Sequence, residues 1–260
     1  MKKTILALAL CGAVQLRAES PTPKVGVTNA GKSVRILCVG DSITAGYTDN
    51  PKWEVPFEFG YRAGLFERLA KAGYQVQFVG SSPEPWNGQW GLPKNSPSPD
   101  LRAIGQDHHE GHGGWRTAQV LQNIDQWVAR AEPDLVLLMI GINDKDGAQA
   151  AQNLKGIMEK IIAARPQAHL VVAQITPKAK FSQSIVDFNT TLRDTLAPDF
   201  QRRGLKVSTV DQYRHFLKPD GTIDTALFSN QINHPNATGY ERMAQTWFEA
   251  IQDILPVAKK

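Results

Sequence analysis

A mostly apolar stretch from Val34 to Val39, ended by Gly40, constrains the fold of this 260-residue chain most strongly. It is rich in Val and Ile, which is typical of a central parallel strand covered on both faces. Asp41 and Ser42 follow directly, and ligands of open α/β sheets bind beyond the carboxyl ends of such strands. Ser42 is therefore a candidate nucleophile. It could equally cap the next helix, since Asp-Ser after a strand is a common cap, and this stretch leaves both interpretations open.

The rest of the chain alternates apolar segments with amphipathic ones. Strands are predicted at residues 34–40, 75–80, 134–140, 169–175 and 205–210. Helices are predicted at residues 60–71, 116–131, 148–164, 184–203 with an interruption near Pro198, and 237–254. This alternation predicts an α/β protein with one five-stranded parallel sheet, right-handed crossovers and helices on both faces. Residues 81–114 are predicted to form a long loop, and residues 211–235 an irregular segment.

The N-terminus has the pattern of a secretory signal peptide. Lys2 and Lys3 precede an apolar run that is too short to span a bilayer, and Leu16-Arg17-Ala18 offers a small-residue cleavage site. We expect residues 1–18 to be removed, residues 19–33 to be a flexible lead-in, and residues 34–260 to form a single domain of an exported protein, periplasmic or extracellular. A lipidated Cys11 and a cytosolic protein with an apolar N-terminus are the alternatives.

Loss of this segment changes two inferences about partners and stability. The formal charge of +4 falls to about +1, which gives no reason to expect nucleic acid or an acidic membrane as a partner. Cys38 becomes the single cysteine, so stability must come from the core rather than from an internal disulfide. The chain shows no phosphate-binding loop, no dinucleotide fingerprint and no Gly-x-Ser-x-Gly elbow.

Four short segments fall where a strand ends or a helix begins, and such points share one edge of a parallel sheet. They contain Ser42, the Gly113-Gly114 pair, Asn143 and His234. Ester cleavage needs a nucleophile, a base within hydrogen-bonding distance and donors directed at the oxyanion. Ser42 and His234 could supply the first two. The donors could be the backbone N–H groups of Ser42 and Gly114 together with the side-chain amide of Asn143.

With these residues the chain resembles the SGNH, or GDSL-like, hydrolases from about residue 34 to residue 254. Gly-Asp-Ser at Ser42, Gly114, Gly-Ile-Asn-Asp at Asn143 and His-Pro-Asn-Ala-Thr-Gly-Tyr at His234 match the family's four blocks, with Gly113 as an alternative in the second. The stretch from Glu110 to Trp115 also resembles carbohydrate esterases of the acetylxylan-esterase type. The resemblance implies a flavodoxin-like three-layer α/β/α sandwich and serine ester hydrolysis without a cofactor.

One departure from the family concerns the acid that orients the histidine. The positions where relatives have an aspartate are occupied by Gln231 and Asn230. An amide oxygen of either residue, or a backbone carbonyl, could hold the ring of His234. Alternatively, Asp220 or Asp224 could fold back onto it. We favour a Ser42–His234 dyad held by a neutral acceptor.

The long loop contains candidate substrate-binding residues. Trp86, Trp90 and Trp115 could stack on sugar rings or could pin the loop to the body, and Asp41 beside the nucleophile is a further candidate. His108, His109, Glu110 and His112 suggest a metal site, but this glycine-rich stretch is not expected to be helical, and we predict no metal.

Together these features predict a secreted serine esterase that hydrolyses O-acetyl or other short acyl esters of a polysaccharide or oligosaccharide. One alternative is a lipase- or thioesterase-like enzyme that acts on longer acyl chains. Another is a carbohydrate-binding pseudoenzyme, since the fold does not determine the function. No cofactor, nucleic acid or membrane partner is expected after signal cleavage.

Overall fold

The computed structural model describes residues 33–47, 59–81, 101–229 and 232–256, all within one compact unit, Gly31–Lys260. The predicted signal peptide and most of the predicted lead-in lie outside the described residues, as do Trp86, Trp90, Asn230 and Gln231. No helix in the described part of the chain is long and apolar enough to cross a membrane.

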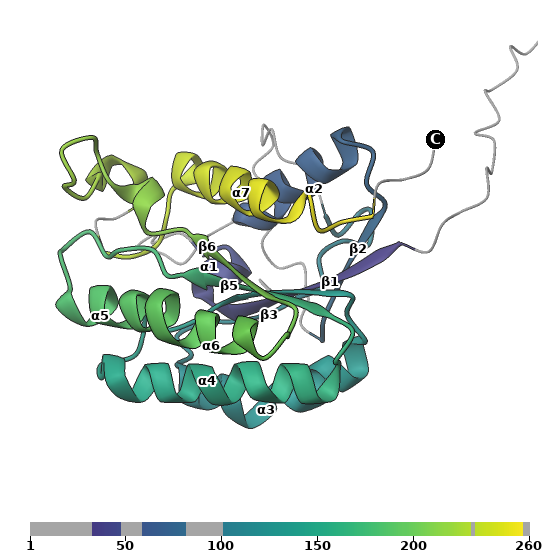
Figure 1. Ribbon diagram of the computed structural model, residues 1–260. Coiled ribbons are helices and arrows are strands. Elements are labelled where there is room, and N and C mark those ends of the chain that lie inside the picture. The colour runs from purple at the N-terminus through teal and green to yellow at the C-terminus, as the bar shows by residue number, and fades with distance from the viewer. Residues whose placement is uncertain (1–32, 48–58, 82–100, 230–231, 257–260) are drawn as a thin grey trace, which may run out of the picture. The chain divides into compact units, whose positions relative to one another are not determined.

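A parallel sheet forms the middle layer of this unit (Figure 1). Its strands are β1 (Val34–Asp41), β2 (Val76–Val79), β3 (Glu110–His112), β4 (Leu135–Met139), β5 (His169–Gln174) and β6 (Val207–Asp211). They lie in the order β2-β1-β4-β5-β6, with β3 paired to β1. Without β3 this is the flavodoxin-like order, whose switch point lies between β1 and β4. The five predicted strands and their parallel arrangement are therefore confirmed.

The sixth strand, β3, is a correction to the sequence analysis, which placed its residues in a loop. β2 pairs with the first half of β1, from Val34 to Leu37, and β3 continues that edge beside Val39, Gly40 and Asp41. A Cβ atom at Gly111 would lie 2.5 Å from the backbone nitrogen of Ala45, so the pairing depends on the absence of a side chain. Three residues are too few to leave a periodic pattern, and the partner strand is about 70 residues away.

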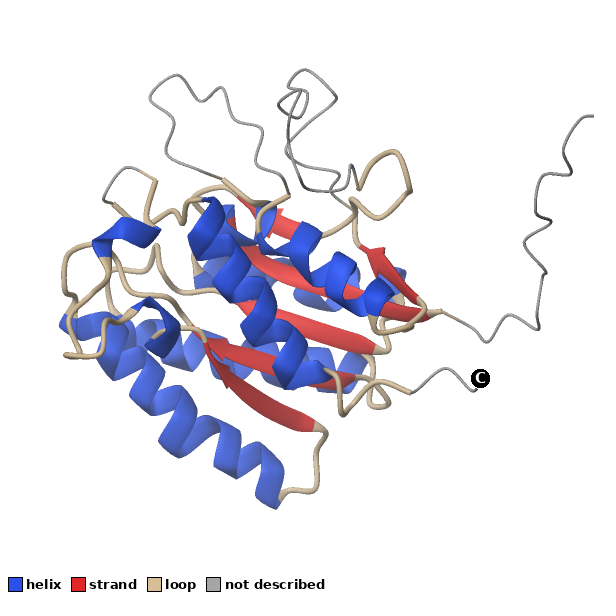
Figure 2. Ribbon diagram, turned by 90° about the horizontal axis from the view of Figure 1, so that it is seen from above, coloured by secondary structure: helices blue, strands red, loops and turns tan. Residues whose placement is uncertain are grey.

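Helices cover both faces of the sheet, which confirms the predicted three layers (Figures 1 and 2). Helices α2 (Tyr61–Lys71) and α7 (Ala237–Ile251) pack together on one face. On the other face lie α3 (Thr117–Ala131), α4 (Gly147–Ala164), α5 (Gln183–Thr191) and α6 (Ala197–Arg202). Because both faces are covered, all five residues of β4 are buried, and so are the last six of β1.

The predicted interruption near Pro198 is present and lies just before the proline. The π-helical stretch Leu192–Leu196 separates α5 from α6, and Pro198 occupies the first turn of α6. Proline has no N–H to donate, so the regular hydrogen-bond pattern of the helix changes just before Pro198. Because proline fits the first turn of a helix, the chain still continues as a helix.

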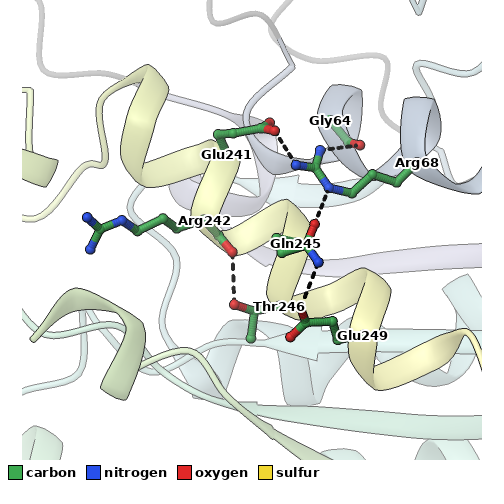
Figure 3. A network of polar contacts seen from close by, with 7 residues as sticks. All are labelled: Gly64, Arg68, Glu241, Arg242, Gln245, Thr246 and Glu249. Carbon is green, nitrogen blue, oxygen red and sulfur yellow. Dashed lines mark hydrogen bonds and ion pairs between the residues drawn. The ribbon is translucent and has the colours of Figure 1, made fainter.

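A polar network joins α2 to α7 at the surface (Figure 3). Arg68 donates to the side chain of Gln245 at 2.7 Å, to Gly64 O at 3.1 Å, and forms an ion pair with Glu241. Helix α7 begins directly after the segment that carries His234. By holding α7 against α2, this network helps to fix the end of that segment.

Candidate active site

Ser42 is the first residue of the short helix α1 (Ser42–Ala45), directly after the central strand β1. Asp41, and not Ser42, is the N-cap, because its Oδ1 accepts a hydrogen bond from Ile43 N at 2.9 Å. A Cβ atom at Gly40 would lie 2.3 Å from Met139 O and from Thr44 Oγ1, so only glycine fits between the strand and this turn. The hydroxyl of Ser42 is thus left to contact another group.

That group is the imidazole of His234. Ser42 Oγ lies 2.7 Å from His234 Nε2, and both side chains are buried. A serine hydroxyl hydrogen-bonded to an imidazole is the arrangement in which the ring can accept its proton during nucleophilic attack. Burial raises the pKa of the nearby Cys38 thiol to about 12, so Cys38 is not a competing nucleophile.

His234 belongs to the irregular segment predicted at residues 211–235, which contains the short helices Arg214–Phe216 and Thr225–Leu227. Ser229 donates to His234 O through both its backbone N–H, at 3.0 Å, and its hydroxyl, at 3.2 Å. The ring of Tyr47 contacts the imidazole edge-on, with the centroids 6.1 Å apart. These local hydrogen bonds and the contact with Tyr47 therefore help to position the imidazole of His234.

A buried arginine beneath the serine turn was not identified from the sequence. The guanidinium of Arg62 is fully buried and donates to three backbone carbonyls: Thr44 O at 3.0 Å, Ala45 O at 3.2 Å and Asp107 O at 3.0 Å. Two of these carbonyls belong to α1, whose last C=O groups have no partner within the helix. An arginine in a helix predicted to be amphipathic gives no signal that distinguishes this contact from an ordinary surface position.

The three candidate oxyanion donors lie on three turns at the carboxyl edge of the sheet. The N–H of Ser42 starts α1, Gly114 precedes α3, and Asn143 follows β4. Gly114 has a φ of +76°, and no atom of the described residues lies within 4 Å of an added Cβ, whereas a Cβ at Gly113 would touch the ring of Tyr47 at 3.0 Å. This openness favours Gly114 over Gly113 as the residue beside a substrate.

The side chain of Asn143 is held by the chain beside Gly114. Its Nδ2 donates to Trp115 O at 2.9 Å, which uses one of the two amide hydrogens. Among the described residues, no hydrogen bond uses the second hydrogen, so a role for it as an oxyanion donor stays a prediction.

Asp41 is buried next to Ser42, and the pKa of its carboxyl is raised. Burial, opposed by the hydrogen bond from Ile43 N and reinforced by the negative charge of Asp144, raises its pKa to about 7. The described hydrogen bond of its side chain lies within the α1 turn, and its role in substrate binding stays a prediction.

Trp115 takes part in an aromatic stack. Its ring lies 4.3 Å from that of His112 and 5.7 Å from that of Trp127, measured between centroids. His112 Nε2 is 3.0 Å from Glu110 Oε2, and Glu110 Oε1 accepts from Ser81 N at 2.6 Å. The stack attaches the end of the long loop to α3. It corresponds to the alternative in which Trp115 pins the loop to the body instead of stacking on a sugar ring.

The histidines considered as metal ligands have other contacts. His109 Nδ1 accepts from Gly111 N at 2.8 Å, and His108 lies 3.3 Å from Asp107. Within the described ranges, no group of three His, Cys, Asp or Glu side chains is arranged to hold a metal ion.

Two of the four candidates for orienting His234 can be examined. Asp220 is exposed, and its Oδ1 accepts from the backbone and hydroxyl of Thr222 at 2.9 and 2.6 Å. Asp224 accepts from Ala226 N at 3.3 Å and lies 3.7 Å from Arg242. Among the described hydrogen bonds, none joins either carboxylate to the ring of His234.

The sequence is similar to those of known acylhydrolases and esterases. Residues 38–242 match the GDSL-like lipase/acylhydrolase family. A multidomain esterase of Ruminococcus flavefaciens is 24% identical over 88% of this chain, and the chain spans only 30% of that relative's length.

Solved structures of carbohydrate esterases have the same fold. A family 3 carbohydrate esterase of Clostridium thermocellum is 26% identical, with a TM-score of 0.64 over 86% of this chain and 97% of that one. A family 3 carbohydrate esterase of Talaromyces cellulolyticus is 22% identical, with a TM-score of 0.60 over 85% and 97%. The family match covers most of the chain, and this protein therefore belongs to the GDSL-like lipase/acylhydrolase family.

Proposed function

We propose that this protein is an exported serine esterase that removes O-acetyl or other short acyl groups from a polysaccharide or oligosaccharide. The observation that carries the proposal is the 2.7 Å contact between Ser42 Oγ and His234 Nε2 at the carboxyl edge of the sheet. Family membership and the carbohydrate esterases of the same fold support the substrate class. The case for export rests on the signal-like pattern of residues 1–18.

The proposed reaction begins with attack of Ser42 Oγ on the acyl carbonyl while His234 Nε2 accepts the hydroxyl proton. The oxyanion of the tetrahedral intermediate accepts hydrogen bonds from Ser42 N–H, Gly114 N–H and Asn143 Nδ2. His234 then returns the proton to the departing sugar oxygen. Water, activated by His234, attacks the acyl-serine and releases the carboxylic acid.

His234 must have its other ring nitrogen protonated and held, so that Nε2 is free to accept. We propose that a neutral acceptor, from Gln231, Asn230 or the backbone, holds the ring. The contacts of Asp220 with Thr222, and of Asp224 with Ala226 and Arg242, support this over a relocated aspartate. A neutral acceptor fixes the tautomer but does not stabilise the imidazolium by charge.

A substrate panel tests the proposed function directly. The purified chain should release acid from aryl acetates and from acetylated glycans much faster than from aryl octanoates, and Ser42→Ala should abolish all release. Preference for octanoate would favour the lipase-like alternative. Binding of glycan without any ester cleavage would favour the carbohydrate-binding alternative.

A further inference from the structure

Two of the three turns that carry the proposed oxyanion donors, those of Gly114 and Asn143, are joined by a second contact besides the Asn143–Trp115 hydrogen bond. Thr117, the first residue of α3, donates from its backbone N–H to Asp144 Oδ2 at 3.0 Å and from its hydroxyl to Asp144 Oδ1 at 2.7 Å. Thr117 is fully buried. The carboxylate next to Asn143 is therefore bound through both oxygens to the segment that begins with Gly114.

The hydroxyl of Thr117 is itself oriented by α4. Asn153 Nδ2 donates to Thr117 Oγ1 at 3.0 Å. Because the hydroxyl accepts this bond, its own hydrogen is directed to Asp144. Asp144 N in turn donates to Gly141 O at 3.1 Å, which closes the turn after β4.

We propose that Thr117 and Asp144 are positioning residues that hold Gly114 N–H and Asn143 Nδ2 at the separation an oxyanion requires. This inference rests on the proposed esterase function. Gly114 is three residues before Thr117 and Asn143 is adjacent to Asp144, so a shift between the two side chains is transmitted to both donors. Donors fixed in advance stabilise the transition state because they need not reorganise as charge develops.

Ordinary capping of α3 is the competing explanation. A carboxylate that accepts from an N-terminal N–H of a helix stabilises the helix whatever the site does. Capping alone predicts lower stability with unchanged chemistry. The positioning role predicts a lower kcat at nearly constant KM, since the donors act mainly in the transition state.

The first experiment removes only the hydroxyl. Thr117→Val should lower kcat for a small aryl acetate by about 10- to 100-fold, with KM within about twofold, while Thr117→Ser should regain most of the activity. Thr246→Val is the matched control, because that buried threonine on α7 donates its hydroxyl to Arg242 O at 2.8 Å, away from these turns (Figure 3). The control should keep the kcat of the parent.

A double-mutant cycle separates positioning from folding. In an Asn143→Ala background one donor is already absent, so Thr117→Val should cost less than about threefold in kcat. An equal loss in both backgrounds, or a kcat within twofold of the parent in a folded Thr117→Val protein, would overturn the proposal. If Thr117→Val does not fold, Asp144→Asn replaces it, with a kcat loss and the same dependence on Asn143 expected.

The two proposals fail in distinguishable ways. If the folded parent cleaves no ester at all, the esterase function is wrong and the positioning role is wrong with it. If the parent cleaves aryl acetates and the Thr117 and Asp144 variants match it, only the positioning role is wrong.

Discussion

Ser42 and His234 meet at one point but are held by different kinds of structure. Ser42 follows a strand paired on both edges, begins a helix whose four residues are all buried, and lies above the three hydrogen bonds of Arg62. His234 lies in an irregular segment, held by Ser229 and by the isolated bridge between Phe228 and Pro235. The difference implies that removing the contacts that hold the Ser42 turn should lower stability, whereas substitutions in the segment around His234 should leave stability largely unchanged.

The largest effect should come from Ser42 and His234, the two side chains proposed to react. Ser42→Ala and His234→Ala should each lower kcat by about 10⁴-fold or more, since the pair acts as a unit. Far-ultraviolet circular dichroism should show both variants folded. A double variant no slower than either single one would support joint action, whereas additive losses would contradict it.

The turn that carries Ser42 should depend on Arg62 for its stability. Arg62→Met leaves three buried carbonyls without their donors, and each such group costs about 1–3 kcal/mol, so we expect a loss of about 3 kcal/mol in the free energy of unfolding. The matched control is Arg68→Met on the same helix, whose surface contacts should contribute less than about 1 kcal/mol. Urea unfolding measures both, and equal losses would contradict the comparison.

Asn143 tests the proposed oxyanion site. Asn143→Ala should lower kcat by about 100- to 1,000-fold, because one donor to the oxyanion is lost, with little change in KM. Steady-state kinetics on an aryl acetate would measure this. Near-normal turnover in the folded variant would remove Asn143 from the mechanism.

The buried carboxyl of Asp41 should make the serine side sensitive to pH. Its pKa is about 7, well above the ordinary value of 3.8. Between these values the folded state binds more protons than the unfolded state, so the contribution of Asp41 to stability is full below pH 4 and declines as the pH rises through 7.

Asp41→Asn should remove this decline, because asparagine can still cap α1 and does not ionise. Thermal unfolding of both proteins at pH 5 and pH 8 gives the measurement, with the variant gaining on the parent at pH 8. Parallel pH profiles would show that Asp41 does not titrate in this range.

The smallest effects on kcat are expected from substitutions in the segment around His234. Asp220→Asn and Asp224→Asn should leave kcat within about twofold, since their described partners are Thr222, Ala226 and Arg242. Gln231→Asp or Asn230→Asp should raise kcat if a negative charge then supports the imidazolium. A large loss from Asp220→Asn or Asp224→Asn in a folded protein would identify a displaced acid and contradict the dyad.

Local patterns in the sequence predicted the layers and the meeting of the site residues. Each long strand is an apolar run and each long helix has an apolar face, so their burial could be inferred without knowledge of their partners. Ser42, Asn143 and His234 are recognisable because their short motifs lie at ends of strands and starts of helices, which converge in a parallel sheet.

Only the tertiary structure decided the features that depend on residues far apart in the chain. β3 is a strand because Gly111 fits against α1, and Arg62 is buried because the carbonyls of Thr44, Ala45 and Asp107 surround it. Thr117 reaches Asp144 because the start of α3 lies beside the turn that follows β4. Asp41 rather than Ser42 caps α1, which left the serine hydroxyl for His234. The contacts of Gly111, Arg62 and Thr117 have no sequence period or motif, since each is specified by the packing of separate segments rather than by the order of residues within one.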